Sequence, residues 1–419
     1  MVMRLCFVLA AVALMAGCQV EVSRRPIGRG ARSTEPRVEM PAGPIATLRA
    51  NVTTSARIRL EITPVGVVRY DGQVLPMLSP NGRFLAVEEG AAPTWPTLLA
   101  ADGAVPPLRT RIAVYEITDR RLRRVEFALQ LPTGLVLGRS ADENGFLVES
   151  PRPDGSRWIG LVDWVAGGVE WLVRDQHVNA HAVFTPTGHL VYARRSIGQP
   201  AVSLVMRDRF GNVDVQSSDE ASAIIPLCTD EPGVVYVFAQ EDGELNVRAI
   251  HIVESSIKRD AFVLGSIEMQ RRIASNAPAT LAYQCLAGVG YGLPAGDQGA
   301  SLVELPVVFF HPVLKRLVAM DRRDGSFGTF PERSFAAARS RFQDTPGYFV
   351  ATPNELFFSM IRSGPFSAEP VRSARALDDA YIPRASTNPD LPLVVFGPSD
   401  RDPYELAVLR VSIPSPDQN

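Results

Sequence analysis

Short apolar runs separated by turn-forming residues make up most of the chain from Arg57 onward. The runs hold Val, Ile, Leu, Phe and Tyr, as at residues 84–87, 112–117, 234–238 and 356–360. Gly, Pro, Asn and Asp lie between them, which is the pattern of β-strands joined by turns. Helical periodicity is scarce, and the best helical candidate is the short stretch Phe335–Phe342. The pattern predicts one all-β domain over residues 57–413, followed by a short tail at 414–419.

One turn-and-strand unit recurs along this domain. In its clearest copy, Leu78–Val87, an Asn-Gly turn leads into the apolar strand Phe-Leu-Ala-Val. Looser copies follow at 140–148, 185–192, 229–236, 352–358 and 387–394, with a degenerate copy at 285–291. Their turns are 36 to 66 residues apart, a range that includes the roughly 40–50 residues of a propeller blade.

The unit fits the geometry of such a blade. Asn-Gly adopts positive φ at low cost, so an innermost strand can turn sharply into the next one. That next strand lies between neighbouring blades, which favours a continuous apolar run. Ser79–Val87 resembles the repeat of WD40-like propellers of the type in the periplasmic Tol-system protein. The resemblance implies a β-propeller of six or seven blades, usually a protein-binding platform.

The two ends of the domain have matching strand patterns. Arg57–Thr63 alternates at the start, and Tyr404–Ile413 alternates at the end. We expect the N-terminal strand to complete the last blade, which leaves only short, protected sheet edges. A β-sandwich of two facing sheets is the alternative fold.

The first residues have the order of an export signal. Arg4 precedes an apolar run, Leu5–Met15, that is too short to span a bilayer, and the small residues Ala16 and Gly17 follow. Leu14–Cys18 resembles the lipobox of bacterial lipoproteins, except that Met15 stands where Leu, Val or Ile is commoner. The resemblance implies that residues 1–17 are removed and that Cys18 carries the acyl chains of a membrane anchor. An ordinary secretory signal with an incidental cysteine, or a cytoplasmic protein with an apolar start, are the alternatives.

Residues 18–56 are rich in Arg, Pro, Gly, Ser and Thr, which predicts a flexible tether after the lipidated cysteine. The formal net charge is −2, so no overall field favours nucleic acid. The lipobox resemblance implies an envelope protein that faces the periplasm. Its expected partners are the membrane, through the lipid, and a protein or another envelope component.

Two cysteines remain once the signal and the lipid site are set aside. Cys228 and Cys285 would lie in a compartment that permits disulfides. A disulfide between them and two separate buried thiols are both compatible with the sequence. Two cysteines alone do not make a closed zinc site.

Three histidines, His177, His181 and His189, lie close together in the sequence. His177 and His181 would share one face of a predicted strand at about 13 Å, too far apart for one ion. We therefore expect no metal site and no cofactor. Asp154–Trp158 resembles the sialidase Asp-box but lacks its Asp-x-Gly spacing, so a hairpin turn is predicted there.

Two further segments are candidates for contacts. Four arginines at 120, 121, 123 and 124 lie between predicted strands, where we expect a solvated hairpin; contact with phosphate or lipopolysaccharide is the alternative. Residues 88–109 form a Pro- and Ala-rich insertion that contains Trp95. A long loop with a Trp suits an interface anchor, and a loop packed on its blade fits equally well.

No nucleophile elbow, His-Glu-x-x-His, P-loop or dinucleotide fingerprint stands in its required context, so no catalytic residue is nominated. The sequence favours a non-enzymatic, membrane-anchored platform that binds a protein or envelope component. The alternative is a propeller hydrolase or lyase that acts on glycan or phosphoester at the channel mouth.

Overall fold

The fold is known from a computed structural model, in which every regular element of the described residues is a β-strand. These residues all belong to one unit, Val38–Asn419. The described ranges are 58–70, 76–89, 111–118, 121–218, 221–227, 233–241, 244–253, 256–257, 262–268, 307–311, 316–320, 327–342, 345–364, 367–378, 381–386, 393–399 and 405–412.

Three antiparallel sheets have four strands each. The first consists of β2 (Met77–Leu78), β3 (Phe84–Glu89), β4 (Arg111–Ile117) and β5 (Leu122–Arg124). The second consists of β22 (Ala336–Phe342), β23 (Thr345–Thr352), β24 (Glu355–Gly364) and β25 (Ser367–Leu377). The third joins β1 (Glu61–Arg69) to β28 (Glu405–Ser412), β27 (Leu393–Pro398) and β26 (Ile382–Ala385).

The largest sheet divides into two antiparallel groups of four strands. The first group is β6 (Val136–Ala141), β7 (Gly145–Pro151), β8 (Arg157–Asp163) and β9 (Gly167–Val173). The second is β10 (His177–Phe184), β11 (Leu190–Ser196), β12 (Val202–Arg207) and β13 (Val213–Ser218). A parallel pairing at Val178 and Arg157 is what joins β10 to β8. The β6–β9 and β10–β13 groups therefore pair with each other only where β8 and β10 begin.

Two further sheets complete the described strands. One has five strands: β14 (Ala221–Pro226), β15 (Val234–Glu241), β16 (Glu244–Val253), β17 (Ser256–Ile257) and β18 (Phe262–Glu268). The other has three: β19 (Val307–His311), β20 (Arg316–Met320) and β21 (Phe327–Thr329). Across the described ranges, five sheets have at least four strands, fewer than the six or seven blades expected.

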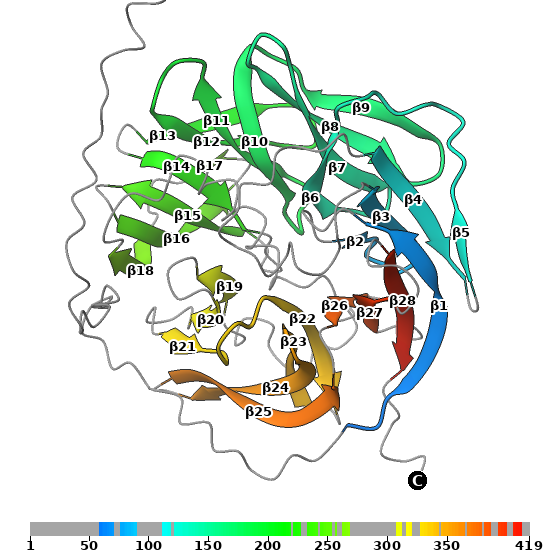
Figure 1. Ribbon diagram of the computed structural model, residues 1–419. Coiled ribbons are helices and arrows are strands. Elements are labelled where there is room, and N and C mark those ends of the chain that lie inside the picture. The colour runs from blue at the N-terminus through cyan, green and yellow to red at the C-terminus, as the bar shows by residue number, and fades with distance from the viewer. Residues whose placement is uncertain are drawn as a thin grey trace, which may run out of the picture. The chain divides into compact units, whose positions relative to one another are not determined.

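The architecture is an all-β propeller. Figure 1 shows the sheets arranged around a centre, with β2, β6, β22 and β26 toward it and β5, β9 and β25 on the outside. Inner strands of successive groups are in contact, since β6 contacts β10 and β22 contacts β26. The sheets do not face one another in two layers, so the sandwich alternative is wrong. Within the described part of the chain, no helix has the length and apolar character needed to cross a bilayer.

The repeated unit marks the turn from an inner strand into the strand beside it. At the β2–β3 turn, Gly82 has a φ of 73°, and the Phe84 N–H donates to Ser79 Oγ at 2.8 Å. The copies at 140–148, 185–192, 229–236 and 387–394 likewise lead into β7, β11, β15 and β27. These second strands contain unbroken buried runs, such as Phe84–Glu88 in β3, because they lie between sheets. The copy at 285–291 lies outside the described residues.

Two expectations about the segment 335–358 are wrong. The helical candidate Phe335–Phe342 is strand β22, whose residues 336–340 are all buried. Ala and Arg favour helix in isolation, but small side chains also suit an inner strand packed on both faces. The turn at 352–354 joins β23 to β24, so the copy there marks the second turn of its sheet instead of the first.

The N-terminal strand completes the last sheet, as expected. β1 pairs antiparallel with β28 from Glu61 opposite Ser412 to Arg69 opposite Glu405. The strand begins a few residues later than the alternation at Arg57–Thr63 indicated, and its buried side chains include Val65 and Val68. The two ends of the domain thus meet in one sheet.

The apolar core lies between neighbouring sheets. Trp164, in the β8–β9 turn, is 2% exposed. Its ring stacks on Phe84 of the β2–β5 sheet at 5.8 Å and contacts Phe146 of β7 at 4.9 Å. Its indole N–H donates to the Asp142 carbonyl at 3.0 Å. One side chain therefore seals the contact between two sheets.

Candidate functional site

Most of the site residues expected from the sequence lie outside the described residues. This applies to the lipid-attachment residue Cys18, to the cysteines Cys228 and Cys285, and to Trp95 with the whole of residues 90–110. The lipid anchor, the disulfide and the Trp95 interface therefore stay predictions.

The three histidines are placed apart by the strand that carries two of them. His177 begins β10, whereas His189 follows its far end in the β10–β11 turn. His181 lies in a β-bulge between Ala180 and Val183, with a φ of 61°. In the described ranges, no three His, Cys, Asp or Glu side chains are grouped so that they could hold a metal ion.

The bulge at His181 is stabilised by a carboxylate from the neighbouring group. The His181 N–H donates to Glu149 Oε1 of β7 at 2.7 Å, and Glu149 Oε2 accepts from Arg157 at 2.8 Å. One position earlier in the ring, the Leu137 N–H of β6 donates to Glu88 Oε1 of β3 at 2.6 Å. Both glutamates are buried. Each glutamate accepts a hydrogen bond from a backbone N–H on the inner strand of the next group. Such an N–H would be costly to bury without an acceptor.

Asp154–Trp158 is the predicted hairpin turn, between β7 and β8. Gly155 has a φ of 85°, and the Arg152 N–H donates to the Ser156 carbonyl at 2.9 Å. Asp154 Oδ1 accepts from the Ser156 hydroxyl and backbone N–H at 2.6 and 2.9 Å. Hydrogen bonding from that hydroxyl, more than any other contact, lowers the pKa of Asp154.

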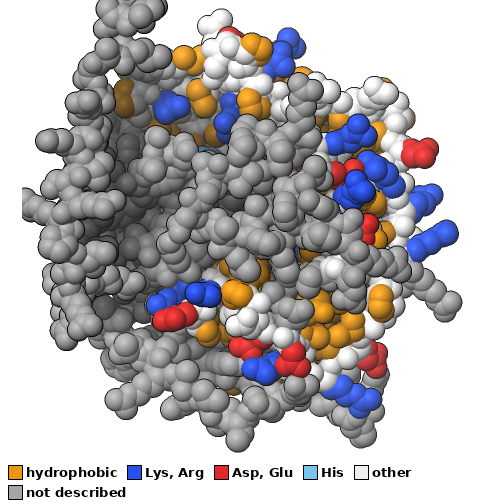
Figure 2. Space-filling model, in the orientation of Figure 1, with side chains coloured by type: hydrophobic (Ala, Val, Ile, Leu, Met, Phe, Trp, Pro, Cys, Tyr) orange, Lys and Arg blue, Asp and Glu red, His pale blue; other side chains and the backbone are white. Residues whose placement is uncertain are grey.

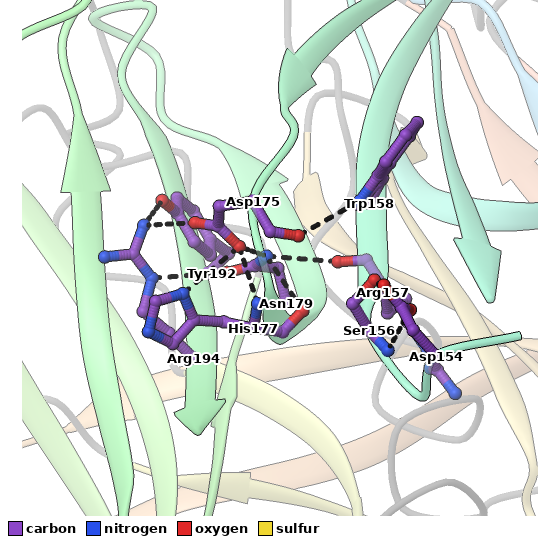
Figure 3. Close-up of polar contacts among 9 residues, drawn as sticks. All are labelled: Asp154, Ser156, Arg157, Trp158, Asp175, His177, Asn179, Tyr192 and Arg194. Carbon is purple, nitrogen blue, oxygen red and sulfur yellow. Dashed lines mark hydrogen bonds and ion pairs between the residues drawn. The ribbon is translucent and has the colours of Figure 1, made fainter. Parts of the chain in front are cut away.

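A polar network joins the two groups at the end where β8 and β10 begin (Figure 3). Its centre is Asn179, which is fully buried on β10. The Asn179 amide nitrogen donates to Asp175 Oδ1 at 2.7 Å and to the Arg157 carbonyl of β8 at 3.0 Å. Arg194 of β11 donates to Asp175 Oδ2 at 3.1 Å and to the Tyr192 hydroxyl at 2.9 Å.

The network holds Asp175 as a carboxylate. Burial alone would raise its pKa, but hydrogen bonds from the Asn179 side chain and the His177 backbone, with the Arg194 charge, outweigh it and lower the pKa. His177 Nδ1 lies 3.3 Å from Asp175 Oδ1. These polar side chains pair with one another, so their arrangement fixes the β9–β10 connection.

Trp158 presents a different kind of surface at the same end. Its indole N–H donates to the Asp175 carbonyl at 3.0 Å, which fixes the ring at the junction of the two groups. The guanidinium carbons of Arg152 and Arg174 lie 4.4 and 4.6 Å from the centroid of that ring. Both arginines are exposed. We call Trp158, Arg152 and Arg174 the indole–guanidinium cluster.

Three of the clustered arginines, Arg121, Arg123 and Arg124, are described and lie elsewhere, in β5 and just before it. Arg123 pairs with Glu116 beside Arg83, which lies 2.7 Å from Glu116 Oε1, and Arg124 lies 2.9 Å from Glu89. The side-chain hydrogen bonds from Arg83 and then Arg123 lower the pKa of Glu116. Figure 2 shows acidic and basic side chains interspersed over this region. The predicted hairpin is confirmed, Arg120 lies outside the described residues, and the intermixed charge does not favour a phosphate site.

Sequence reasoning missed the indole–guanidinium cluster. Arg152 and Trp158 flank a hairpin that was predicted, but Arg174 comes from the β9–β10 connection. The available signal was local: Arg174-Asp-Gln-His interrupts two apolar strands with four polar residues. Nothing in the spacing shows that this segment meets the earlier hairpin.

No family model and no curated protein matches the chain. Among solved structures, the Dos1 propeller is 8% identical, with 83% of this chain and 95% of that chain covered and a TM-score of 0.46. The Swd1 β-propeller domain of Myceliophteria thermophila is 11% identical, with 84% and 100% covered and a TM-score of 0.42. TolB from Acinetobacter baumannii is 17% identical with a TM-score of 0.31, and the match covers 43% of this chain and 41% of TolB. The propeller assignment here comes from the strand topology.

Proposed function

We propose that the chain is an envelope lipoprotein whose propeller binds a protein or another envelope component without turning it over. The anchor is Cys18, supported by the apolar run and small residues that precede it. The observation that carries the binding role is the indole–guanidinium cluster, because Trp and Arg are the side chains enriched at the energetic centres of interfaces.

We further propose that the ring has seven blades. The β6–β9 and β10–β13 groups count as two, since their only strand pairing is the parallel one at Val178 and Arg157. The three-stranded β19–β21 sheet counts as one incomplete blade. With the other four sheets, the total is seven, the upper value that the resemblance to WD40-like propellers implies.

The binding face is the end of the ring where β8 and β10 begin. The parallel pairing brings the β7–β8 turn and the β9–β10 connection to the same end. The end of β11 joins them, because Ser196 pairs with His177. Three loops from two groups thus lie at the end that carries Trp158. The polar network beneath them is paired internally, which favours a positioning role over catalysis.

Site-specific photo-crosslinking in the native cells tests the binding role. A photoreactive amino acid replaces Gln176, an exposed residue beside the cluster, or Thr187, an exposed residue at the other end of β10. We expect one dominant adduct from position 176, reduced by Trp158→Ala, and none from position 187. Equal labelling from both positions, or none from 176, would overturn the proposed face.

The anchor has its own test. Cys18→Ser should release the chain from membranes, and globomycin should cause the unprocessed precursor to accumulate, because two or more acyl chains are needed for stable anchoring. Cell fractionation and immunoblotting measure both effects. Continued membrane retention of the Ser variant, with unchanged processing, would remove the lipoprotein assignment and leave the binding face untouched.

A further inference from the structure

The indole–guanidinium cluster contains hydrogen-bond donors that can bind a ligand. A guanidinium that lies over an aromatic ring uses its flat face, so its N–H edge stays available. Arg157 and Arg194 nearby are already paired with Glu149 and Asp175. Among the described residues, neither Arg152 nor Arg174 has a carboxylate within ion-pair distance. Two cationic edges at one indole are therefore free to bind an anion.

The two guanidiniums are held close together. Their carbons lie 4.4 and 4.6 Å from the same ring centroid, so they are at most about 9 Å apart. Stacking on the indole limits their rotamers, which lowers the entropy lost when they bind a ligand. In an extended chain, side chains at i and i+2 share one face and lie about 7 Å apart. That spacing lies within the upper limit of about 9 Å on the separation of the two guanidinium carbons.

The surroundings favour a protein segment over a polyanion. Asp154 lies in the same hairpin as Arg152, so a dense run of phosphates would meet a negative charge as well. Ile197, 49% exposed, lies against Gly155, with its Cδ1 3.9 Å from the place that a Cβ there would take. Cationic, aromatic and aliphatic groups side by side are typical of protein interfaces.

We propose that this face recognises an extended acidic protein segment with Asp or Glu at positions i and i+2. One carboxylate binds the N–H edge of Arg152 and the other that of Arg174, each with the paired geometry that guanidinium and carboxylate share. The proposal rests on the proposed function, because it names the chemical class of the partner at the same face.

Peptide binding to the full-length protein in detergent tests the proposal. The probe is an eight-residue Gly-Ser peptide with Glu at i and i+2, compared with its Gln counterpart, with a Glu pair at i and i+1, and with a galacturonate oligomer. Fluorescence anisotropy of labelled probes gives Kd. The i, i+2 Glu peptide should bind at least about tenfold more tightly than the Gln peptide, and more tightly than the other two probes.

Arginine variants assign the effect to the cluster. Arg152→Gln and Arg174→Gln should each weaken binding of the i, i+2 Glu peptide about tenfold. The matched control is Arg209→Gln, since Arg209 also lies over an aromatic ring, that of Phe210, at 4.8 Å. The control should change Kd less than twofold, and all three variants should melt within a few degrees of the parent.

The outcomes separate the proposal from the proposed function. If the Gln peptide binds as tightly as the Glu peptide, or the galacturonate oligomer binds best, the acidic-segment proposal is overturned. A single crosslinked partner at position 176 would then still support the binding face. If position 176 gives no dominant adduct, the binding face itself is lost.

Discussion

At the scale of single residues, buried carboxylates connect one group of strands to the next. Glu149 accepts the His181 N–H and pairs with Arg157, and Glu88 accepts the Leu137 N–H in the equivalent place. An inner strand that bulges leaves backbone donors without a strand partner. The two glutamates therefore make equivalent hydrogen bonds between successive groups of strands, Glu88 to β6 and Glu149 to β10.

Glu149→Ala should lower the free energy of unfolding by about 1–3 kcal/mol, because it removes the carboxylate that accepts the His181 N–H and pairs with Arg157. Glu149→Gln keeps an acceptor oxygen and should cost less. Urea denaturation measures both. Glu170→Ala, at an exposed position of β9, is the control and should stay within about 0.5 kcal/mol of the parent. Equal losses at 149 and 170 would remove the role assigned to Glu149.

Asp175 predicts a pH-dependent contribution to stability. Its pKa is lowered in the fold, so its stabilising effect is fully present above its unfolded pKa of about 3.9 and is lost as pH falls through the folded value. Asp175→Asn should therefore cost about 1–2 kcal/mol at pH 7 and clearly less at pH 3. Urea midpoints of the parent and the variant at the two pH values test this. A difference that is unchanged at pH 3 would contradict the assignment.

At the scale of elements, aromatic side chains seal the contacts between sheets. Trp164 is buried between β3 and β7, whereas Trp158 is partly exposed at the end of the ring. The two residues have the same side chain but different surroundings. Trp164 should therefore contribute mainly to stability, and Trp158 mainly to binding.

Trp164→Ala should lower the free energy of unfolding by about 3–5 kcal/mol, as expected when a buried aromatic leaves a cavity. Trp158→Ala should cost clearly less than Trp164→Ala, because the Trp158 ring is only partly buried, and it should weaken the contacts of the binding face. Chemical denaturation and the position-176 crosslink measure the two effects. A variant at 158 that destabilises as much as the one at 164 would argue that Trp158 is a core residue.

The strands and their turns were largely predictable because they are local features. Asn81-Gly82 and the apolar run after it specify the β2–β3 turn and the buried second strand within ten residues. Phe335–Phe342 shows the limit: helix-favouring Ala and Arg form an inner strand, since its place in the sheet decides the outcome. Local composition carries no information about that place.

The functional face was not predictable for a related reason. Arg152 and Trp158 are close in sequence, but Arg174 and Asn179 reach them only through the parallel contact of β10 with β8. The bulge at His181 also changes which side chains of β10 share a face. Register and bulges depend on pairing between distant segments, so the spacing of His177 and His181 along the chain did not reveal the bulge at His181.

At the scale of the whole molecule, the beginning and the end of the domain meet in one sheet. β1 pairs with β28 along its length, and the sheets between them surround a centre (Figure 1). A closed ring removes exposed sheet edges. It also holds neighbouring groups packed side by side, which keeps the loops near Trp158 together. The arrangement of the binding face therefore depends on closure of the ring by β1.

Disulfide trapping across β1 and β28 tests closure most directly. Val67 lies opposite Ala407, and directly opposed residues are close enough for a disulfide. Leu409 instead lies opposite Pro64, beyond the bulge at Pro64/Gly66, and is too far from Val67 for a disulfide. The test uses the chain from residue 19 with Cys228→Ser and Cys285→Ser, which contains no other cysteine. In this background, the pair Val67→Cys/Ala407→Cys should form a disulfide readily in air and raise the melting temperature. The control pair Val67→Cys/Leu409→Cys should do neither. Failure of the first pair to oxidise, or equal oxidation of both, would contradict the closed ring.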